Sequence, residues 1–161
     1  MKKLTVGVVA AGNFFLKRYF EEIQKQKHLR LTCLCRTNKQ ALKKIGKITG
    51  VKKLYTDINL MLKSEKLDFV LITSPHSKHF NHIKKVSEYD VNILVEKPLV
   101  VNYDQKSKIE KIINKTKNKI ISIYNPPYES HFNKLKKIIN QKEAGKLKYI
   151  NIFWSDYKKD L

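Results

Sequence analysis

Cysteine is scarce in this sequence, which excludes the small proteins that depend on several disulfides for stability. The only two cysteines, Cys33 and Cys35, stand two apart in a segment typical of a β-strand. Their side chains should share one face of the strand, about 7 Å apart, which is too far to bridge without distortion. We expect two reduced thiols that pack as small core residues, as in a cytoplasmic protein.

Long apolar runs are also missing. No stretch approaches the roughly 20 apolar residues that a membrane-spanning helix needs, and the run that starts at Leu4 soon meets Gly12. We therefore expect neither a membrane protein nor a secreted one. The 161 residues, 42% of them hydrophobic, suffice for one domain with its own core.

Acidic residues are few, because 14 Asp and Glu stand against 34 Lys and Arg and leave a formal net charge of +20. Such an excess alone suggests nucleic acid or another polyanion as a partner. Only Arg18, Arg30 and Arg36 are arginines, although surfaces that bind nucleic acids depend on arginine for bidentate contacts. The lysines are spread over the whole chain, so we interpret them as solvated background charge and do not expect nucleic acid as a partner.

What the sequence does contain is a regular alternation of apolar and amphipathic segments. Short apolar runs end at glycine, proline or polar residues, and apolar residues at helical spacing follow each run. Asn38 and Asp57 are candidate helix caps. The alternation predicts an α/β fold, a Rossmann-like doubly wound parallel sheet. The expected strands span residues 4–10, 29–35, 53–55, 69–73, 91–95 and 119–124.

The segment after residue 124 departs from this alternation. A helix is expected over residues 128–142, and a strand rich in aromatic and β-branched residues over residues 147–154. A lone strand needs neighbours, because an unpaired edge is a template for pairing. It could pair at the edge of the first sheet, or it could begin a second sheet that this chain does not contain.

The turn after the first strand is a candidate nucleotide-binding turn. Small residues there allow a pyrophosphate to approach the backbone and to sit at the N-terminus of the next helix. Of the three spaced glycines typical of such turns, this sequence keeps only the central one, Gly12, flanked by Ala10, Asn13 and Phe14 as further candidate cofactor-binding residues. Phe15 replaces the last glycine, so we expect the helix to be pushed outward or its contact with the sheet to be repacked.

The end of the second strand bears on which dinucleotide could bind. An acidic residue about 20 positions beyond the glycines usually binds the ribose hydroxyls of NAD, but this chain has none between Glu22 and Asp57. Arg36 and Thr37 stand there instead. An arginine beside a hydroxyl suits a 2′-phosphate, which a carboxylate would repel. We therefore predict NADP(H) in preference to NAD(H); the alternative is that Arg36 is one more solvated cation.

Four motifs occur in an order that resembles a known family. They are GVVAAGN over residues 7–13, YTD over residues 55–57, DFVLITSPH over residues 68–76 with His79 following, and VEKPL over residues 95–99. They resemble the Gfo/Idh/MocA (glucose-fructose oxidoreductase/inositol dehydrogenase) oxidoreductases, and the resemblance covers essentially the whole chain. It implies an NAD(P)-dependent oxidoreductase that transfers hydride between nicotinamide and a sugar-like or polyol alcohol.

The resemblance also implies roles for the residues after the fifth strand. Lys97 would be the catalytic residue, beside the nicotinamide and the substrate hydroxyl, where its charge favours the developing alkoxide. Glu96 would help to position Lys97. The peptide bond before Pro98 is a candidate cis bond.

By the same resemblance, Ser74, Pro75 and His76 would line the nicotinamide ribose, and His79 would stand behind the cofactor loop. His76, His79 and His82 are spaced by three residues, which alone could suggest a metal site. Three-residue steps drift around a helix and no carboxylate stands beside them. We therefore expect no metal.

Members of the family are roughly twice as long, so the resemblance implies a truncated chain. Residues 1–124 would form the dinucleotide-binding domain, and residues 125–161 would be the start of a truncated C-terminal substrate domain. Catalysis by this chain alone is not expected, because the substrate wall would come from a complementary substrate-domain chain or from another copy in a homo-oligomer. Alternatives are a non-catalytic dinucleotide-binding or regulatory module, a polyanion-binding relic, and an inactive decaying product.

Overall fold

The computed structural model describes residues 2–141, 145–151 and 153 of the chain. It divides into two compact units, Met1–Ile123 and Tyr124–Leu161, which we describe separately. None of the helices in the described part of the chain is long and apolar enough to cross a membrane.

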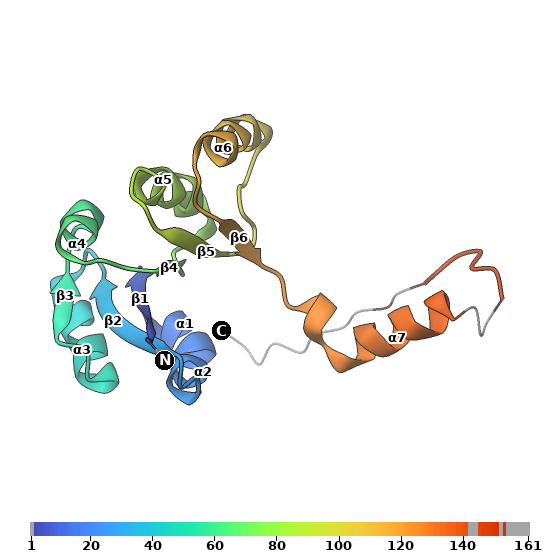
Figure 1. Cartoon of the computed structure of the whole chain (residues 1–161), viewed down its shortest axis with the longest axis horizontal. Helices are drawn as coiled ribbons and strands as arrows, with labels where there is room; N and C mark the ends of the chain where they lie inside the picture. Colours follow the sequence, from blue (N-terminus) through green and yellow to red (C-terminus); the bar gives the residue numbers. More distant parts are fainter. Residues whose placement is uncertain (1, 142–144, 152, 154–161) are drawn as a thin grey trace. The chain divides into compact units, whose positions relative to one another are not determined.

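The first unit contains a six-stranded sheet in which every neighbouring pair of strands is parallel (Figure 1). The strand order is β3-β2-β1-β4-β5-β6, that of a doubly wound Rossmann-like sheet. This confirms the predicted fold class, and the strands lie within a residue or two of the expected ranges. The strands are β1 (Leu4–Val9), β2 (Leu29–Cys35), β3 (Lys53–Tyr55), β4 (Phe69–Ile72), β5 (Asn92–Glu96) and β6 (Ile120–Ile123).

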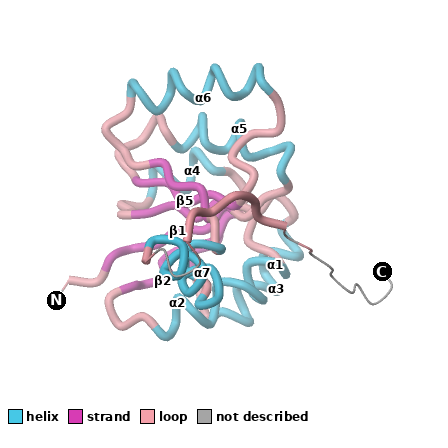
Figure 2. Tube along the Cα trace, turned by 90° about the vertical axis from the view of Figure 1, so that its right-hand side faces the viewer, coloured by secondary structure: helices cyan, strands magenta, loops and turns pink. Residues whose placement is uncertain are grey.

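Helices cover the sheet in two layers, above and below it in Figure 2. One layer holds α4 (Ile58–Ser64), α5 (His76–Val86) and α6 (Tyr103–Lys115). The other layer holds α3 (Lys39–Thr49) and the helical segment that follows β1. That segment runs as α1 (Asn13–Phe15), the π-helical η1 (Leu16–Phe20) and α2 (Glu21–Lys25).

Local capping explains where two of these helices begin and one ends. The side chain of Asn38 accepts a hydrogen bond from the Ala41 amide at 2.9 Å, and Asp57 accepts one from the Leu60 amide at 2.8 Å. Both predicted caps are therefore confirmed. Helix α3 ends at Gly50, whose φ of 73° lies in the left-handed region that glycine adopts without a steric penalty.

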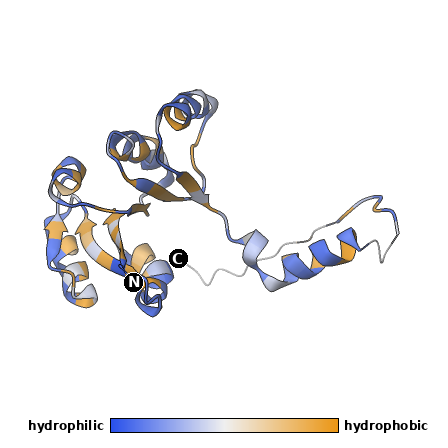
Figure 3. Cartoon of the chain, in the orientation of Figure 1, coloured by the Kyte–Doolittle hydropathy of each residue, from blue (hydrophilic) through white to orange (hydrophobic). Residues whose placement is uncertain are grey.

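The core consists of two clusters, one on each face of the sheet. The strands are largely hydrophobic, as expected for a parallel sheet covered on both faces (Figure 3). Cys33 and Cys35 are buried and unpaired by a disulfide, as predicted. Burial raises the pKa of each thiol to about 12, so both remain neutral core groups at ordinary pH.

Phe15 forms the repacked contact between helix and sheet that the altered glycine motif predicts. Its side chain is fully buried in the cluster with Val6, Val8 and Leu34, and its ring centroid lies 6.2 Å from that of Phe20. The π-helical segment η1 begins at the next residue. A π segment is wider than an α-helix, so the helix passes Phe15 with a locally altered winding, a feature the sequence pattern does not reveal.

The second unit contains a 3₁₀ turn, η2 (Pro126–Tyr128), and the helix α7 (Ser130–Asn140), somewhat shorter than the predicted helix. The strand expected over residues 147–154 is not formed by the described residues 147–151 and 153. Leu147, Tyr149 and Ile150 are exposed. High β-propensity does not make a strand where no neighbouring strand takes up the backbone hydrogen bonds. Residues 142, 152 and 154 of these predicted elements lie outside the described residues.

Ala10 provides a test of the turn after β1. Its φ of 61° lies in the left-handed region, which costs an L-residue about 1 to 2 kcal/mol. Ala10→Gly should relieve this strain and, after the entropic cost of glycine, raise the free energy of unfolding by about 0.5 to 1 kcal/mol. The buried neighbour Ala11 is the control, because Ala11→Gly should lower it by a similar amount. Urea unfolding of both variants checks this, and destabilisation by Ala10→Gly would contradict it.

Candidate functional site

The candidate site lies at the carboxyl edge of the sheet, where the turns after β1, β2, β4 and β5 meet. The strand order reverses its direction between β1 and β4. Doubly wound sheets bind ligands at this point, because the connections from the two strands lead to opposite faces and leave a crevice.

Backbone contacts fix the turn after β1. The amide of Ala11 donates to the carbonyl of Cys35 at 3.2 Å, and the amide of Thr73 donates to the carbonyl of Val9 at 3.1 Å. The Thr73 hydroxyl adds contacts to the Val9 and Ala10 carbonyls, each at 3.3 Å. The turn is therefore held from the ends of both neighbouring strands.

Gly12 allows the close approach of a side chain rather than an unusual backbone conformation. Its φ of −154° is ordinary extended backbone, but a Cβ at this position would lie 2.5 Å from Nη1 of Arg36. The same Nη1 donates to the carbonyl of Ala11 at 3.1 Å. Arg36 thus lies across the glycine turn and places its positive charge at the start of the helix.

A cavity of about 570 Å³ opens over this turn. It brings together Ala10, Gly12, Asn13, Phe14, Arg36, Thr37, Ser74 and Pro75, the predicted cofactor-binding residues of three different turns. Sequence reasoning missed further residues that line it, namely Thr56, Asp57, Lys78, His82 and Lys85. Its charged side chains are three cations and one carboxylate, and that carboxylate, Asp57, already caps α4.

A second cavity of about 450 Å³ adjoins the first and shares Phe14, Thr73, Ser74 and Pro75 with it. His76, Glu96 and Lys97 complete its lining. The two cavities together contain every predicted site residue except His79.

Tyr19 anchors Glu96 at this end of the site. Its hydroxyl donates to Glu96 Oε1, and Glu96 Oε2 accepts from the amide of Lys97 at 3.1 Å. Burial, followed by the hydrogen bond and the charge of Glu96, raises the pKa of Tyr19. The Lys97–Pro98 peptide is cis, as predicted. The hydrogen bond between Tyr19 and Glu96 joins residues 77 positions apart, and no motif in the sequence predicts it.

His79 lies behind the cavities rather than in their walls. Its ring is fully buried, with Nδ1 2.7 Å from the carbonyl oxygen of Pro98 and Nε2 2.8 Å from that of Ser74. One turn further along α5, Nδ1 of His82 lies 2.9 Å from the Ser74 hydroxyl. Both side chains therefore support the turn after β4. Within the part of the chain that the structure describes, no group of three His, Cys, Asp or Glu could hold a metal ion.

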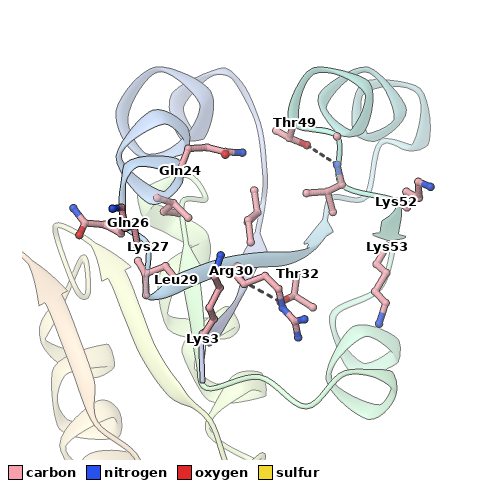
Figure 4. A pocket seen from close by; sticks show the side chains of 14 residues that line it. Lys3, Gln24, Gln26, Lys27, Leu29, Arg30, Thr32, Thr49, Lys52 and Lys53 are labelled. Atoms are coloured by element: carbon pink, nitrogen blue, oxygen red, sulfur yellow. Dashed lines mark hydrogen bonds between the residues drawn. The ribbon is translucent and has the colours of Figure 1, made fainter. Parts of the chain in front are cut away.

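A larger hollow, of about 840 Å³, lies elsewhere (Figure 4). Its lining comes from the amino-terminal ends of β2 and β3 and from the carboxyl ends of α2 and α3. The cations on its rim include Lys27, Arg30 and Lys52. Lysine is abundant everywhere in this chain, and this edge lacks the glycine turn, so size alone does not make it the functional site.

Comparison with known proteins gives a family match over most of the chain. Residues 4–125 match the model of an oxidoreductase family with an NAD-binding Rossmann fold, Gfo/Idh/MocA. The uncharacterized oxidoreductase YrbE of Bacillus subtilis is 23% identical over 144 residues, which are 89% of this chain and 42% of that protein. D-apiose dehydrogenase of Paraburkholderia graminis is 24% identical over 59% of this chain and 25% of its own length. The chain thus spans less than half of these curated relatives.

Solved structures share the fold. Scyllo-inositol dehydrogenase from Lactobacillus casei, solved with bound NAD(H) and scyllo-inositol, superposes with a TM-score of 0.81 at 20% identity. The match covers 89% of this chain and 43% of that one.

His82, which contacts the Ser74 hydroxyl, should make the stability of the fold depend on pH. Burial first, and then the charges of Lys85, His79 and Lys78, lower its pKa from 6.5 to about 4. The unfolded chain therefore binds a proton at pH values where folded His82 does not, so this group stabilises the fold above pH 6.5 and loses that contribution as the pH falls toward 4. Between about pH 7 and pH 4.5, the free energy of unfolding of the wild type should fall by on the order of 1 kcal/mol more than that of His82→Gln, after allowance for solvent screening. Chemical unfolding at both pH values measures the difference, and equal losses would contradict the assignment.

Proposed function

We propose that this chain, which belongs to the Gfo/Idh/MocA family of NAD-binding Rossmann-fold oxidoreductases, binds a nicotinamide dinucleotide across the carboxyl edge of its sheet. The family reaction we assign to it is hydride transfer to or from a sugar-like or polyol alcohol. The observation that carries the proposal is the convergence of four strand-end turns on two adjoining cavities, with every predicted cofactor residue but His79 in their walls.

The pyrophosphate would lie over the turn after β1. Gly12 precedes the first helical residue and has no side chain to cap the amides there, so those amides are available to an anion. Arg36 brings a cation to the same place. The residues present therefore fit the cofactor's phosphates.

We further propose that NADP(H) is bound in preference to NAD(H). Arg36 and Thr37 occupy the end of β2, and Lys78 and Lys85 add two further positive charges to the cavity. A guanidinium suits the dianionic 2′-phosphate, since it can donate two parallel hydrogen bonds. The Lactobacillus casei neighbour was solved with NAD(H), so the preference rests on the residues of this chain alone.

The second cavity would receive the nicotinamide end, with Ser74, Pro75 and His76 beside the ribose. When bound, the nicotinamide supplies the hydride acceptor or donor. Lys97 would place its ammonium beside the substrate alcohol and favour the charge that develops on the alcohol oxygen. Glu96, held by Tyr19 and by the Lys97 amide, would fix the start of the turn that carries Lys97.

The rest of the active site is part of the proposal. An open half-site does not shield hydride transfer from water or position a proton donor. We assign residues 125–161 to the start of a substrate domain, and we propose that the wall facing the two cavities comes from such a domain. A cytoplasmic setting accords with the two reduced cysteines. A cofactor-binding module without turnover is the second candidate, because the two cavities bring together eleven of the predicted cofactor-binding residues but a single predicted catalytic residue, Lys97.

The cofactor preference is tested through Arg36. In calorimetric titrations we expect the wild type to bind NADPH about tenfold more tightly than NADH, because a paired 2′-phosphate contributes roughly 1.4 kcal/mol. Arg36→Gln should remove this difference by weakening NADPH binding more than NADH binding, because NADH loses only the charge of Arg36 beside the pyrophosphate.

Two controls separate this from general charge attraction. Arg30→Gln removes the same charge at the opposite edge of the sheet and should leave the preference intact. Gly12→Trp should abolish binding of both cofactors by filling the approach to the turn. A preference that fades at high salt equally in wild type and Arg36→Gln would show that no 2′-phosphate site exists.

A further inference from the structure

His79 joins two turns that are far apart in sequence. Its Nδ1 contacts the carbonyl of Pro98, 19 residues away, and its Nε2 contacts the carbonyl of Ser74, five residues away. The ring is fully buried, so water does not compete for either contact. One rigid side chain therefore spans the gap between the end of β4 and the turn after β5.

Both turns are walls of the nicotinamide-end cavity. Ser74, Pro75 and His76 of one turn line the cavity, as does Lys97 of the other turn, and Pro98 directly follows Lys97 in the chain. The distance between these walls sets the width of the cavity at the position proposed for hydride transfer. Because each ring nitrogen of His79 lies within hydrogen-bond distance of a carbonyl oxygen, one in each turn, the ring bridges the two turns without lining the cavity itself.

We propose that His79 is a positioning residue that sets Lys97 against the nicotinamide-binding turn. The inference rests on the proposed function, since it assigns a role within that same site. It also predicts that the two halves of the cofactor depend on different residues. The glycine turn and Arg36 bind the adenosine and phosphate half, whereas His79 acts mainly on the nicotinamide half, because its ring joins the Ser74 turn, which both cavities share, to the turn that carries Lys97.

The chemistry of imidazole suits this task. Its two nitrogens point in diverging directions from a flat, rigid ring, and each can carry hydrogen. Both partners are carbonyl oxygens, which only accept hydrogen bonds. The ring therefore donates to both of them only when both of its nitrogens carry hydrogen, and a ring with hydrogen on one nitrogen donates to one of them. A leucine in place of His79 would have no hydrogen-bond donor. Glutamine offers donors from a single nitrogen at the end of a flexible chain, so it can restore one link but not the rigid span.

The charged and titratable groups around the ring come from the three elements packed on it. On α5, the His76 ring lies with its centroid 5.6 Å away, and Lys78 and His82 flank the turn of helix. The turn after β4 supplies the Ser74 hydroxyl, which His82 contacts. The turn after β5 supplies Glu96 and Lys97, and Glu96 is already bound to Tyr19. The Ser74 turn is thus contacted by both His79 and His82, whereas of these two histidines only His79 contacts the Pro98 turn.

The test compares two ligands on the same variants. NADPH reaches both halves of the site, whereas 2′-phospho-ADP-ribose lacks the nicotinamide. For His79→Leu we expect NADPH affinity to fall about tenfold and 2′-phospho-ADP-ribose affinity to change less than about twofold. His79→Gln should recover part of the loss. His28→Leu, at the amino-terminal edge of the sheet, is the control and should leave both affinities unchanged.

The outcomes separate the two proposals. If the wild type binds neither ligand, the proposed function fails. If the wild type binds both but His79→Leu weakens neither or weakens both equally, the site stands and the positioning role is overturned. If His79→Leu does not fold, the ring ¹⁵N resonances of His79 in the wild type provide the test. NADPH should shift these resonances and 2′-phospho-ADP-ribose should not. An equal response to both ligands would overturn the positioning role.

Discussion

The parallel pairing of β1 with β4 is the constraint on which the rest of the structure depends. At the amino-terminal end of this pair, the Asp68 carboxylate accepts hydrogen bonds from the amide and hydroxyl of Thr5 at 2.7 and 2.8 Å. At the carboxyl end, Thr73 binds the carbonyl of Val9. The two halves of the sheet are thereby locked in register, and the glycine turn of one half faces the Ser74 turn of the other. Both cavities of the candidate site include Thr73 and Ser74, so this pairing positions them both.

Much of the fold could be predicted from the sequence because its signals are local. Apolar runs of strand length, the caps Asn38 and Asp57, and the glycine at the end of α3 each act within a few residues. Alternation of strands and helices then leaves few topologies, because crossovers between parallel strands are right-handed. The strand-end residues of the site follow from the same logic, since all strands of a parallel sheet end at one edge. Arg36, Ser74 and Lys97 could therefore be expected near one another.

What the sequence could not reveal depends on contacts between distant residues. The hydrogen bond from Tyr19 to Glu96 and the two carbonyl contacts of His79 depend on how separate turns approach one another, which residue spacing does not encode. The π-helical winding beyond Phe15 is likewise a response to packing. The expected strand over residues 147–154 illustrates the converse, because β-propensity describes a fit to neighbouring strands and not an intrinsic preference. His82 and Lys85 were missed because their helix turns them toward the cavity at positions that carry no family motif.

We expect the cofactor to bind at the carboxyl edge of the sheet, even though lysines are spread along the whole chain. The most direct measurement is a titration of the ¹⁵N-labelled chain with NADPH at elevated salt, with shifts mapped residue by residue. Saturable shifts are expected at residues 10–15, 36–37, 73–79 and 96–98, with the amino-terminal edge around Arg30 and Lys52 unaffected. Shifts confined to that edge, or spread over lysines without saturation, would show that the carboxyl edge is not the cofactor site and would favour a polyanion-binding surface.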